Sequence, residues 1–452
     1  MNNKIKTLVA TTVLIACSNT FGAVSSEEAM ALKNELTPLG AERAGNADGS
    51  IPAWTGGVTE ADVANATAQP RENYFADDAV QYVVDKNNVD EYSELLSEGV
   101  QALINKYPDS FRLNVYETRR TAAAPEWVYE NTYQNALRAV ATENGNSVEN
   151  AYGGTPFPIP KTGAEVMWNH LLRWKGESVE LPFRVFVGSS DGKTTLAVAA
   201  KDEHQMPYYY EDGDLDSFQG DALLIRQLQT EPAFKAGESI LIRDPLDQVN
   251  EGRKAWQYLA GQRRVRRAPT IAFDTPDFVA SGQNYFDEVF MFFGSLERYD
   301  WNLLGKQEML IPYNNNAFLT KTFDEVLDGH HLNSDQMRWE KHRVWVVEAT
   351  LAEGKRHVVP KKRFYVDEDS WSVVLVDGYD ANGELWRVQH AVPFVAPEIP
   401  AVVTTTFTAF NLPADTWVVN LLYNEQDVQY RPVRRRPDIY FTPDALAGSG
   451  IR

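Results

Sequence analysis

From Leu181 to Leu422 the chain repeats one pattern that leaves few folds open to it. Short runs rich in β-branched and aromatic residues alternate with turn signals, and no long helical pattern intervenes. The first two runs, 183–187 and 196–200, flank Gly188-Ser-Ser-Asp-Gly192, which suits a hairpin turn. Asn382-Gly383 between two later runs is a type I′ hairpin signal. Repeated hairpins predict an antiparallel sheet, curved or closed, and not a parallel sheet with crossover helices.

Helical patterns come before the sheet. Apolar residues at i, i+3, i+4 spacing predict amphipathic helices over 88–107, 126–141 and 164–174. Further strands are expected at 222–228, 239–243, 255–267, 288–293, 301–311, 344–351, 363–366, 371–376, 385–390, 401–410 and 415–422. The fold class is therefore α+β and mainly β, with the helices packed against one large sheet.

Residues 254–267 combine a strand pattern, interrupted by a short Gly-containing break at 260–262, with four arginines. If 263–267 is extended, Arg263 and Arg267 share one face, while Arg264 and Arg266 share the other. An unpaired buried charge costs several kcal/mol, so this strand must border water, an anionic partner or a cavity with polar walls.

The same stretch carries a family resemblance. Residues 256–269, WQYLAGQRRVRRAP, resemble the signature of the bacterial domain-of-unknown-function family 1329, often labelled outer membrane lipoprotein-sorting proteins. Similar matches at 45–57, 152–160 and 436–446 extend the resemblance over nearly the whole chain after residue 22. The family has no settled biochemical function. The fold that it implies resembles the LolA/LolB lipoprotein carriers, a curved, half-open antiparallel barrel closed by helices over an apolar cavity.

We accordingly expect four parts. They are a signal peptide (1–22), an N-terminal loop and helical region (23–175), the antiparallel β half-barrel (176–422) and an extended C-terminal strap (423–452).

The N-terminus indicates export. Lys4 and Lys6 precede an apolar run, residues 8–16, that is too short to cross a bilayer as a helix. Two processing outcomes stay open. Cleavage near Ala23, where family members usually end their signal, gives a soluble periplasmic protein, whereas lipidation of Cys17 in a lipobox-like context gives an outer-membrane lipoprotein. The first is favoured.

Charge excludes some partners. The formal net charge of −20 becomes −22 after removal of residues 1–22, because two lysines leave and no acid does. An acidic surface argues against nucleic acid and against adhesion to anionic lipid, since both need basic footprints.

No catalytic or metal-binding motif emerges. The adjacent His330 and His331 would point to opposite faces of a strand, and a contribution from His342 or Asp328 has no supporting metal-ligand spacing. Asp212, Asp214 and Asp216 lack the glycine and terminal glutamate of a calcium loop. Ser, His and Asp do not form a hydrolase arrangement. We therefore predict no enzyme, no catalytic residues, no cofactor and no metal.

Aromatic residues indicate a ligand instead. Most must form the core, but a curved sheet covered by few helices leaves part of its concave face for an apolar ligand, with arginines at the rim for an anionic headgroup. The candidate ligand-binding residues are Trp256, Tyr258, Arg263, Arg264, Arg266, Arg267, Trp301, Trp345 and Trp386.

Two functions from different classes are favoured, and a third, a hydrolase acting on an envelope substrate, would need a cleft where Asp or Glu meets His. The first is a periplasmic carrier or chaperone for a lipid, lipoprotein or other hydrophobic ligand. The resemblance also implies a partner, since family members are commonly encoded beside exporters of the resistance-nodulation-division type. The alternative is an accessory or structural subunit of an outer-membrane or exporter complex that binds no small ligand, which a filled concave face would favour.

Overall fold

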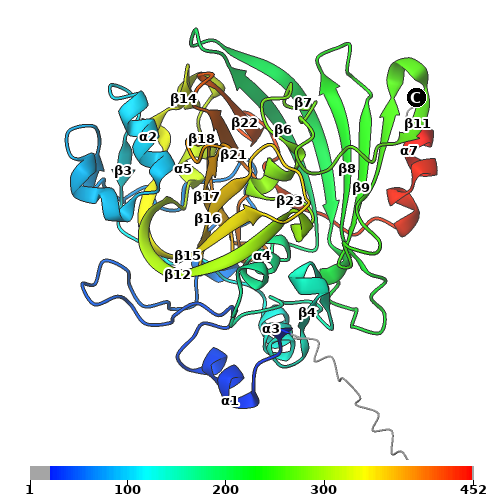
Figure 1. Ribbon diagram of the computed structural model, residues 1–452, viewed down its shortest axis with the longest axis horizontal. Coiled ribbons are helices and arrows are strands. Elements are labelled where there is room, and N and C mark those ends of the chain that lie inside the picture. Colours follow the sequence, from blue (N-terminus) through cyan, green and yellow to red (C-terminus); the bar gives the residue numbers. More distant parts are fainter. Residues whose placement is uncertain (1–20, 450–452) are drawn as a thin grey trace, which may run out of the picture.

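The computed structural model describes residues 21–449, and most of this chain surrounds one large curved sheet (Figure 1). Cys17 and the rest of the predicted signal before Phe21 lie outside the described residues. Within 21–449 the sheet has 16 strands. They are β2 (Tyr82–Val84), β3 (Leu113–Val115), β6 (Ser178–Gly188), β7 (Thr194–Gln205), β8 (Asp221–Glu231), β9 (Ser239–Pro245), β10 (Lys254–Leu259), β11 (Arg264–Arg267), β12 (Tyr299–Pro312), β15 (Trp339–Leu351), β16 (Lys361–Asp367), β17 (Val373–Tyr379), β18 (Leu385–Ala391), β21 (Phe407–Asn411), β22 (Thr416–Leu422) and β23 (Arg431–Pro432).

The strand order confirms the predicted antiparallel half-barrel. The order runs β11-β10-β9-β8-β7-β6-β22-β21-β18-β17-β16-β15-β3-β2, with β12 on β15 and β23 on β6. Its pairs are antiparallel except for one parallel bridge between Trp339 of β15 and Val115 of β3. The two ends of this order do not pair, so the sheet is open. In Figure 1 the strands β6–β9 stand on one side of the molecule and β15–β18 on the other.

Small elements surround this sheet. The helices are α1 (Ser26–Ala29), α2 (Glu98–Lys106), α3 (Glu126–Arg138), α4 (Gly163–Leu171), α5 (Asn316–Leu319), α6 (Phe323–Val326) and α7 (Pro443–Ser449). The minor strands are β1 (Phe21–Gly22), β4 (Val140–Thr142), β5 (Ser147–Glu149), β13 (Leu327–Asp328), β14 (His331–Leu332), β19 (Phe394–Ala396) and β20 (Ala401–Val403). The helix α4 packs against β12 and β15, and it begins where Thr162 and Glu165 form a reciprocal capping box. Within residues 21–449 no helix has the length and apolar character needed to cross a membrane.

Several predicted elements are divided. The pattern over 88–107 gives a 3₁₀ segment, Val89–Leu95, and then α2, because Leu96 is extended and the Ser97 hydroxyl caps the new helix. The run 401–410 is likewise split between β20 and β21. Residues 382–383 do lie in a hairpin turn, but only Gly383 has a positive φ, so the turn is not type I′.

The predicted strand at 288–293 is wrong. Its residues instead form a 3₁₀ turn, Phe286–Met291, in which Phe290 and Met291 have left-handed φ values of 55° and 73°. A short apolar run does not by itself distinguish a strand from another buried conformation. Here the run turns inward and contacts His204 of β7 and Phe364 of β16.

The arginine segment is a hairpin and not one strand. A 3₁₀ turn, Ala260–Gln262, and a left-handed Arg263 separate β10 from β11, which is the last strand at this edge of the sheet. The C-terminal tail also departs from the expected extended strap. Pro443 starts α7, and this helix packs against β9, β10 and β11 (Figure 1).

Candidate functional site

The strands β7–β10 have two chemically distinct faces. Ile225, Ile240 and Ile242 belong to the main core inside the half-barrel. Their neighbours Leu224 and Leu241 point the other way and pack with Phe441 beside α7. Alternation along each strand therefore defines an inner face, which faces the concave side, and an outer face, which α7 covers.

Residues 278–293, the plug segment, lie against the inner face. Phe290 is T-shaped against the ring of His204 on β7, with centroids 5.6 Å apart. Phe290 and Phe293 pack together at 5.3 Å, and Phe278 and Phe286 at 5.4 Å. The concave side of the half-barrel is thus filled largely by aromatic side chains of the chain itself.

Buried ion pairs attach the plug segment to the other wall of the half-barrel. The Asp287 carboxylate lies 2.8 Å from His357 and 3.0 Å from Lys362 on β16. Glu288 binds Arg387 of β18 at 2.5 and 2.7 Å. Burial alone would raise the pKa of Asp287, but Lys362 and His357 hold it well below its ordinary value. These contacts fix the polar end of the plug segment on β16 and β18.

At the β7–β10 wall the packing is incomplete. Two cavities of about 40 and 50 Å³ remain between the plug segment and the inner face. Both are bordered by Phe290 and Phe293, so these two rings separate them. Each has room for a few waters, whereas pockets for drug-sized ligands measure about 300–1,000 Å³. A lipid chain therefore does not fit unless the two rings move.

The first cavity contains two buried cations without an acidic partner. Lys175 is 6% exposed and Arg173 is 3% exposed. The Lys175 ammonium has no hydrogen bond or ion pair with any residue of 21–449 and lies 5.7 Å from the Phe290 ring centroid. Burial lowers its pKa to about 7, with a further contribution from the charge on Arg173.

Arg173 is only partly satisfied. Its terminal nitrogens donate to the carbonyls of His170 (2.5 Å) and Thr404 (3.0 Å), but its Nε has no partner. The nearby acid, Asp244, is already bound by Arg253 through two contacts of 2.7 Å. The cavity therefore keeps an uncompensated positive charge.

Polar atoms along the second cavity are also unsatisfied. Asp202 and Gln227 line it, and within residues 21–449 Asp202 Oδ1 and Gln227 Oε1 have no hydrogen-bond partner. Nδ1 of the neighbouring His204 also has none. Each such atom costs about 1–3 kcal/mol when buried without a partner. The plug segment thus fills this wall without satisfying its polar groups.

The four predicted arginines lie outside these cavities. Arg263, Arg264, Arg266 and Arg267 are exposed at the hairpin and on edge strand β11. Within residues 21–449 none of them forms an ion pair, and Arg266 donates to the Gln257 side chain at 3.3 Å. Of the three surroundings expected for this segment, the exposed arginines fit water. Arg264 and Arg266 alternate along β11 as expected, but Arg263 does not share a strand face with Arg267, because the chain turns at Arg263. β11 is an edge strand, where charges hinder association with other strands.

The predicted aromatic residues are not gathered into one cavity either. Trp256 and Tyr258 pack on the outer face with the residues beside α7. Trp301 packs against Phe292 and Phe364, next to the plug segment. Trp345 stacks with Trp371 at 6.4 Å, and Trp386 donates to Asn411 at 3.1 Å. Ligand binding by the nine residues stays a prediction.

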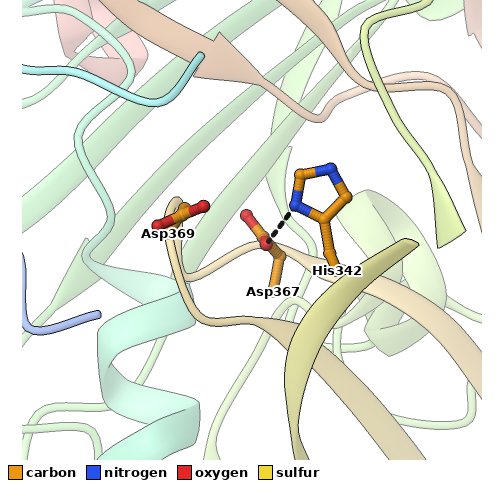
Figure 2. A group of neighbouring side chains, drawn as sticks. All are labelled: His342, Asp367 and Asp369. Atoms are coloured by element: carbon orange, nitrogen blue, oxygen red, sulfur yellow. Dashed lines mark ion pairs between the residues drawn. The ribbon is translucent and has the colours of Figure 1, made fainter. Parts of the chain in front are cut away.

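A separate group of buried side chains contains potential metal ligands. Figure 2 shows His342, Asp367 and Asp369, whose potential ligand atoms lie within 4.8 Å of one another. Both oxygens of Asp369 are occupied by Arg120, at 2.6 and 2.9 Å. His342 Nε2 contacts Glu340 at 3.0 Å. A guanidinium already stands where a cation would bind, so these residues form an ion-pair network and do not fit a metal.

The network supports the N-terminal loop. Arg120 also donates to the carbonyl of Glu42 at 2.7 Å and of Pro52 at 3.3 Å. The Trp54 indole donates to the Ala122 carbonyl at 2.9 Å. These contacts hold the glycine-rich segment 45–57 against the body of the protein.

Sequence reasoning missed Lys175, Arg173 and the position of the plug segment. For the aromatic run 290–293 the sequence pattern predicts a strand. The only available signal for the cations was that they lie at the end of the predicted amphipathic helix 164–174, whose apolar face includes Leu171 and Trp174. That signal does not separate a buried lysine from an exposed one.

Comparisons with known proteins place the chain in a family. The family model described as "Protein of unknown function (DUF1329)" matches residues 83–447. An uncharacterized protein of Pseudomonas aeruginosa, PA3922, is 37% identical over 99% of both chains.

Two solved structures are more distant. One, provisionally described as an outer membrane lipoprotein-sorting protein domain, comes from Vibrio parahaemolyticus and is 14% identical, with a TM-score of 0.43, over 63% of this chain and 98% of that chain. The other is a LolA superfamily protein of Nitrosomonas europaea, 14% identical with a TM-score of 0.37 over 63% of this chain and all (100%) of that chain. Similarities of this size do not assign a function.

Proposed function

Because the chain belongs to the DUF1329 family of proteins of unknown function, its activity must be inferred from its own interior, and we propose that it is a carrier for a hydrophobic ligand. The ligand would enter between the inner face of β7–β10 and the plug segment. The observation that supports this is the asymmetry of the plug segment, which is bound by ion pairs on β16 and β18 but leaves cavities and unsatisfied polar atoms against β7–β10.

The free-energy cost of displacing the aromatic rings and the gain from burying a ligand chain in their place are of the same order. Moving the rings of Phe290 and Phe293 off the inner face exposes two large apolar side chains, at about 1.5–3 kcal/mol each. A sixteen-carbon chain entering the same space gains roughly 12 kcal/mol before ordering costs. The left-handed conformations of Phe290 and Met291 add strain of about 1–2 kcal/mol each that opening would relieve. A ligand of this size is therefore able to displace the aromatic tip while the ion pairs stay in place.

The predicted export signal gives this carrier its compartment. If the signal is removed near Ala23, the protein acts in the periplasm, and transfer of a hydrophobic molecule through an aqueous compartment is a task that requires a closed apolar interior. A role beside an exporter or an outer-membrane protein fits the same task. Cleavage there would also remove β1, leaving β4 and β5 as the strands of the small sheet.

A specific observation also favours the alternative, an accessory subunit without a ligand. The plug segment fills the concave side and is held by buried charges on Asp287 and Glu288. If its aromatic tip never leaves the inner face, the half-barrel is a structural body only.

Matched tryptophan substitutions distinguish the two functions. Ile240→Trp fills the inner face at the second cavity, whereas Leu241→Trp adds the same side chain to the outer face of the same strand. Binding of a naphthylamine-type fluorescent probe to purified, delipidated protein should fall at least tenfold in Ile240→Trp and change little in Leu241→Trp. Thermal melting of both variants controls for loss of folding. Absence of probe binding to the wild-type protein, or equal loss in both folded variants, would contradict the carrier function and support the accessory subunit.

A further inference from the structure

The first cavity has the charge of a headgroup site. Its wall is apolar, with Trp168, Phe290 and Phe292 among the lining residues, yet it also contains Lys175 and Arg173. Asp244 is the acid at this cavity, and Arg253 already neutralises it. Buried cations without partners are rare because the desolvation of an unpaired charge is strongly unfavourable.

The geometry of the donors defines the missing partner. The Lys175 ammonium has three donor hydrogens, and within residues 21–449 it faces the Phe290 ring without forming a hydrogen bond. Arg173 leaves its Nε–H unused, while its other nitrogens hold main-chain carbonyls and cannot swing away without losing them. An anion in the cavity of about 40 Å³ would pair with the ammonium and accept the Nε–H bond. Charge-assisted bonds of this kind are about twice as strong as neutral ones.

The position of the cavity fits a ligand with two ends. It lies on one side of Phe290 and Phe293, and the second cavity lies on the other side. When these two rings are displaced, the two spaces join into a single channel with cations at one end. The second cavity is lined by Ile225, Ile240 and Ile242, which suit a hydrocarbon chain.

We infer that the ligand is an anionic amphiphile, with one hydrocarbon chain and a carboxylate or phosphate monoester headgroup bound by Lys175 and Arg173. This inference rests on the proposed carrier function and adds the chemical class of its ligand. It also separates the headgroup site from Arg263 and the three exposed arginines of β11, which lie at the sheet edge and outside the first cavity.

The experiment compares ligands that differ only in the headgroup. Palmitate, hexadecanol and a sixteen-carbon lysophosphatidic acid are titrated into delipidated, full-length mature protein at pH 6, where the lysine is charged, and dissociation constants are measured by displacement of the fluorescent probe. We expect palmitate to bind at least tenfold more tightly than hexadecanol. A further preference for the lysophospholipid over palmitate identifies the phosphate as the natural headgroup, and the reverse order identifies the carboxylate.

Two lysine variants locate the effect. Lys175→Met keeps the length of the side chain and removes its charge, so palmitate and hexadecanol should bind about equally. Lys341→Met also removes one positive charge, but Lys341 pairs with Glu308 and Asp48 outside these cavities, so the palmitate preference should remain. Arg173→Gln is the second variant at the site and should reduce the preference in the same direction.

The outcomes separate the two proposals. If hexadecanol binds to the wild type as tightly as palmitate, the headgroup inference is overturned while the carrier function stands. If Lys175→Met folds and keeps the full preference, the inference is overturned as well. If no chain-bearing ligand binds to the wild type, the carrier function itself fails.

Discussion

Replacing Lys175 by methionine should make this protein more stable, which is the opposite of what most buried substitutions do. The folded pKa of Lys175 is lowered from 10.5 to about 7, because burial disfavours the charged form. Below pH 7 the folded protein must carry the unpaired ammonium, so the full cost of burying this charge reduces its free energy of unfolding. Methionine has a similar length, is apolar and can occupy the same space beside Phe290.

The magnitude follows from this pKa. A difference between 10.5 and about 7 corresponds to about 5 kcal/mol at about 1.4 kcal/mol per pH unit. This pKa is a net value that includes any attraction of the ammonium to the Phe290 ring, since that attraction acts on the charged form. The expected gain for Lys175→Met at pH 6 is therefore up to about 5 kcal/mol. It should shrink as the pH rises from 7 to 10.5, because in that range the unfolded chain keeps a proton that the folded protein has released, which stabilises the wild type progressively.

Urea unfolding at pH 6 and at pH 9 measures this gain directly. Tyrosine and other groups titrate in both proteins, so the difference between the variant and the wild type isolates the lysine. Lys341→Met is the control and should destabilise, because that lysine is ion-paired and its pKa is raised. A destabilised Lys175→Met, or a gain that does not depend on pH, would refute the view that the ammonium is buried without a partner.

The remaining predictions concern protonation, the plug segment and the N-terminus. Palmitate binding at pH 8 should take up about one proton per ligand, because the bound anion, which would lie beside Arg173 and near His204 and Asp244, raises the pKa of Lys175 from about 7. Calorimetry in buffers of different ionisation enthalpy measures this proton uptake. The uptake should be absent in Lys175→Met. Arg387→Met should lower the free energy of unfolding by about 3–5 kcal/mol, because it leaves the Glu288 carboxylate buried without its partner. It should also increase binding of the fluorescent probe, because the plug segment is no longer held on β18. Unchanged probe binding in the folded variant would show that the ion pair does not restrain the segment. The mature protein should begin at Ala23 or Val24 without lipid mass, and a mass spectrum with a diacylglycerol-modified Cys17 as the N-terminus would overturn this.

The antiparallel half-barrel was predictable because its signals are local. A hairpin such as β6–β7 needs only a turn sequence and two alternating runs, and each can be recognised without the rest of the chain. The same holds for α3 and α4, whose observed bounds lie within three residues of the expected 126–141 and 164–174 at each end. The family resemblance then distinguished a half-open barrel from a closed one, which the local signals do not.

The plug segment was not predictable because distant partners determine its position. Glu288 meets Arg387 across 99 residues of sequence, and Asp287 meets His357 across 70. Without those partners, the aromatic run 290–293 is as compatible with a strand as with an inward turn. The burial of Lys175 is a tertiary effect of the same kind, since Phe290 and Asp244 come from other parts of the fold.

Buried charges in this interior therefore have opposite effects on stability. Glu288 and Arg387 satisfy each other, so removing one member exposes the other to an apolar environment and costs stability. Within residues 21–449 Lys175 has no such partner, so its removal should gain stability, and the anionic ligand proposed above would supply the missing partner. A ligand that supplies this anion stabilises the loaded form by the charge interaction that the empty form lacks. Palmitate should accordingly raise the melting temperature of the wild type more than that of Lys175→Met, and an equal shift in both would leave the lysine without a role in binding.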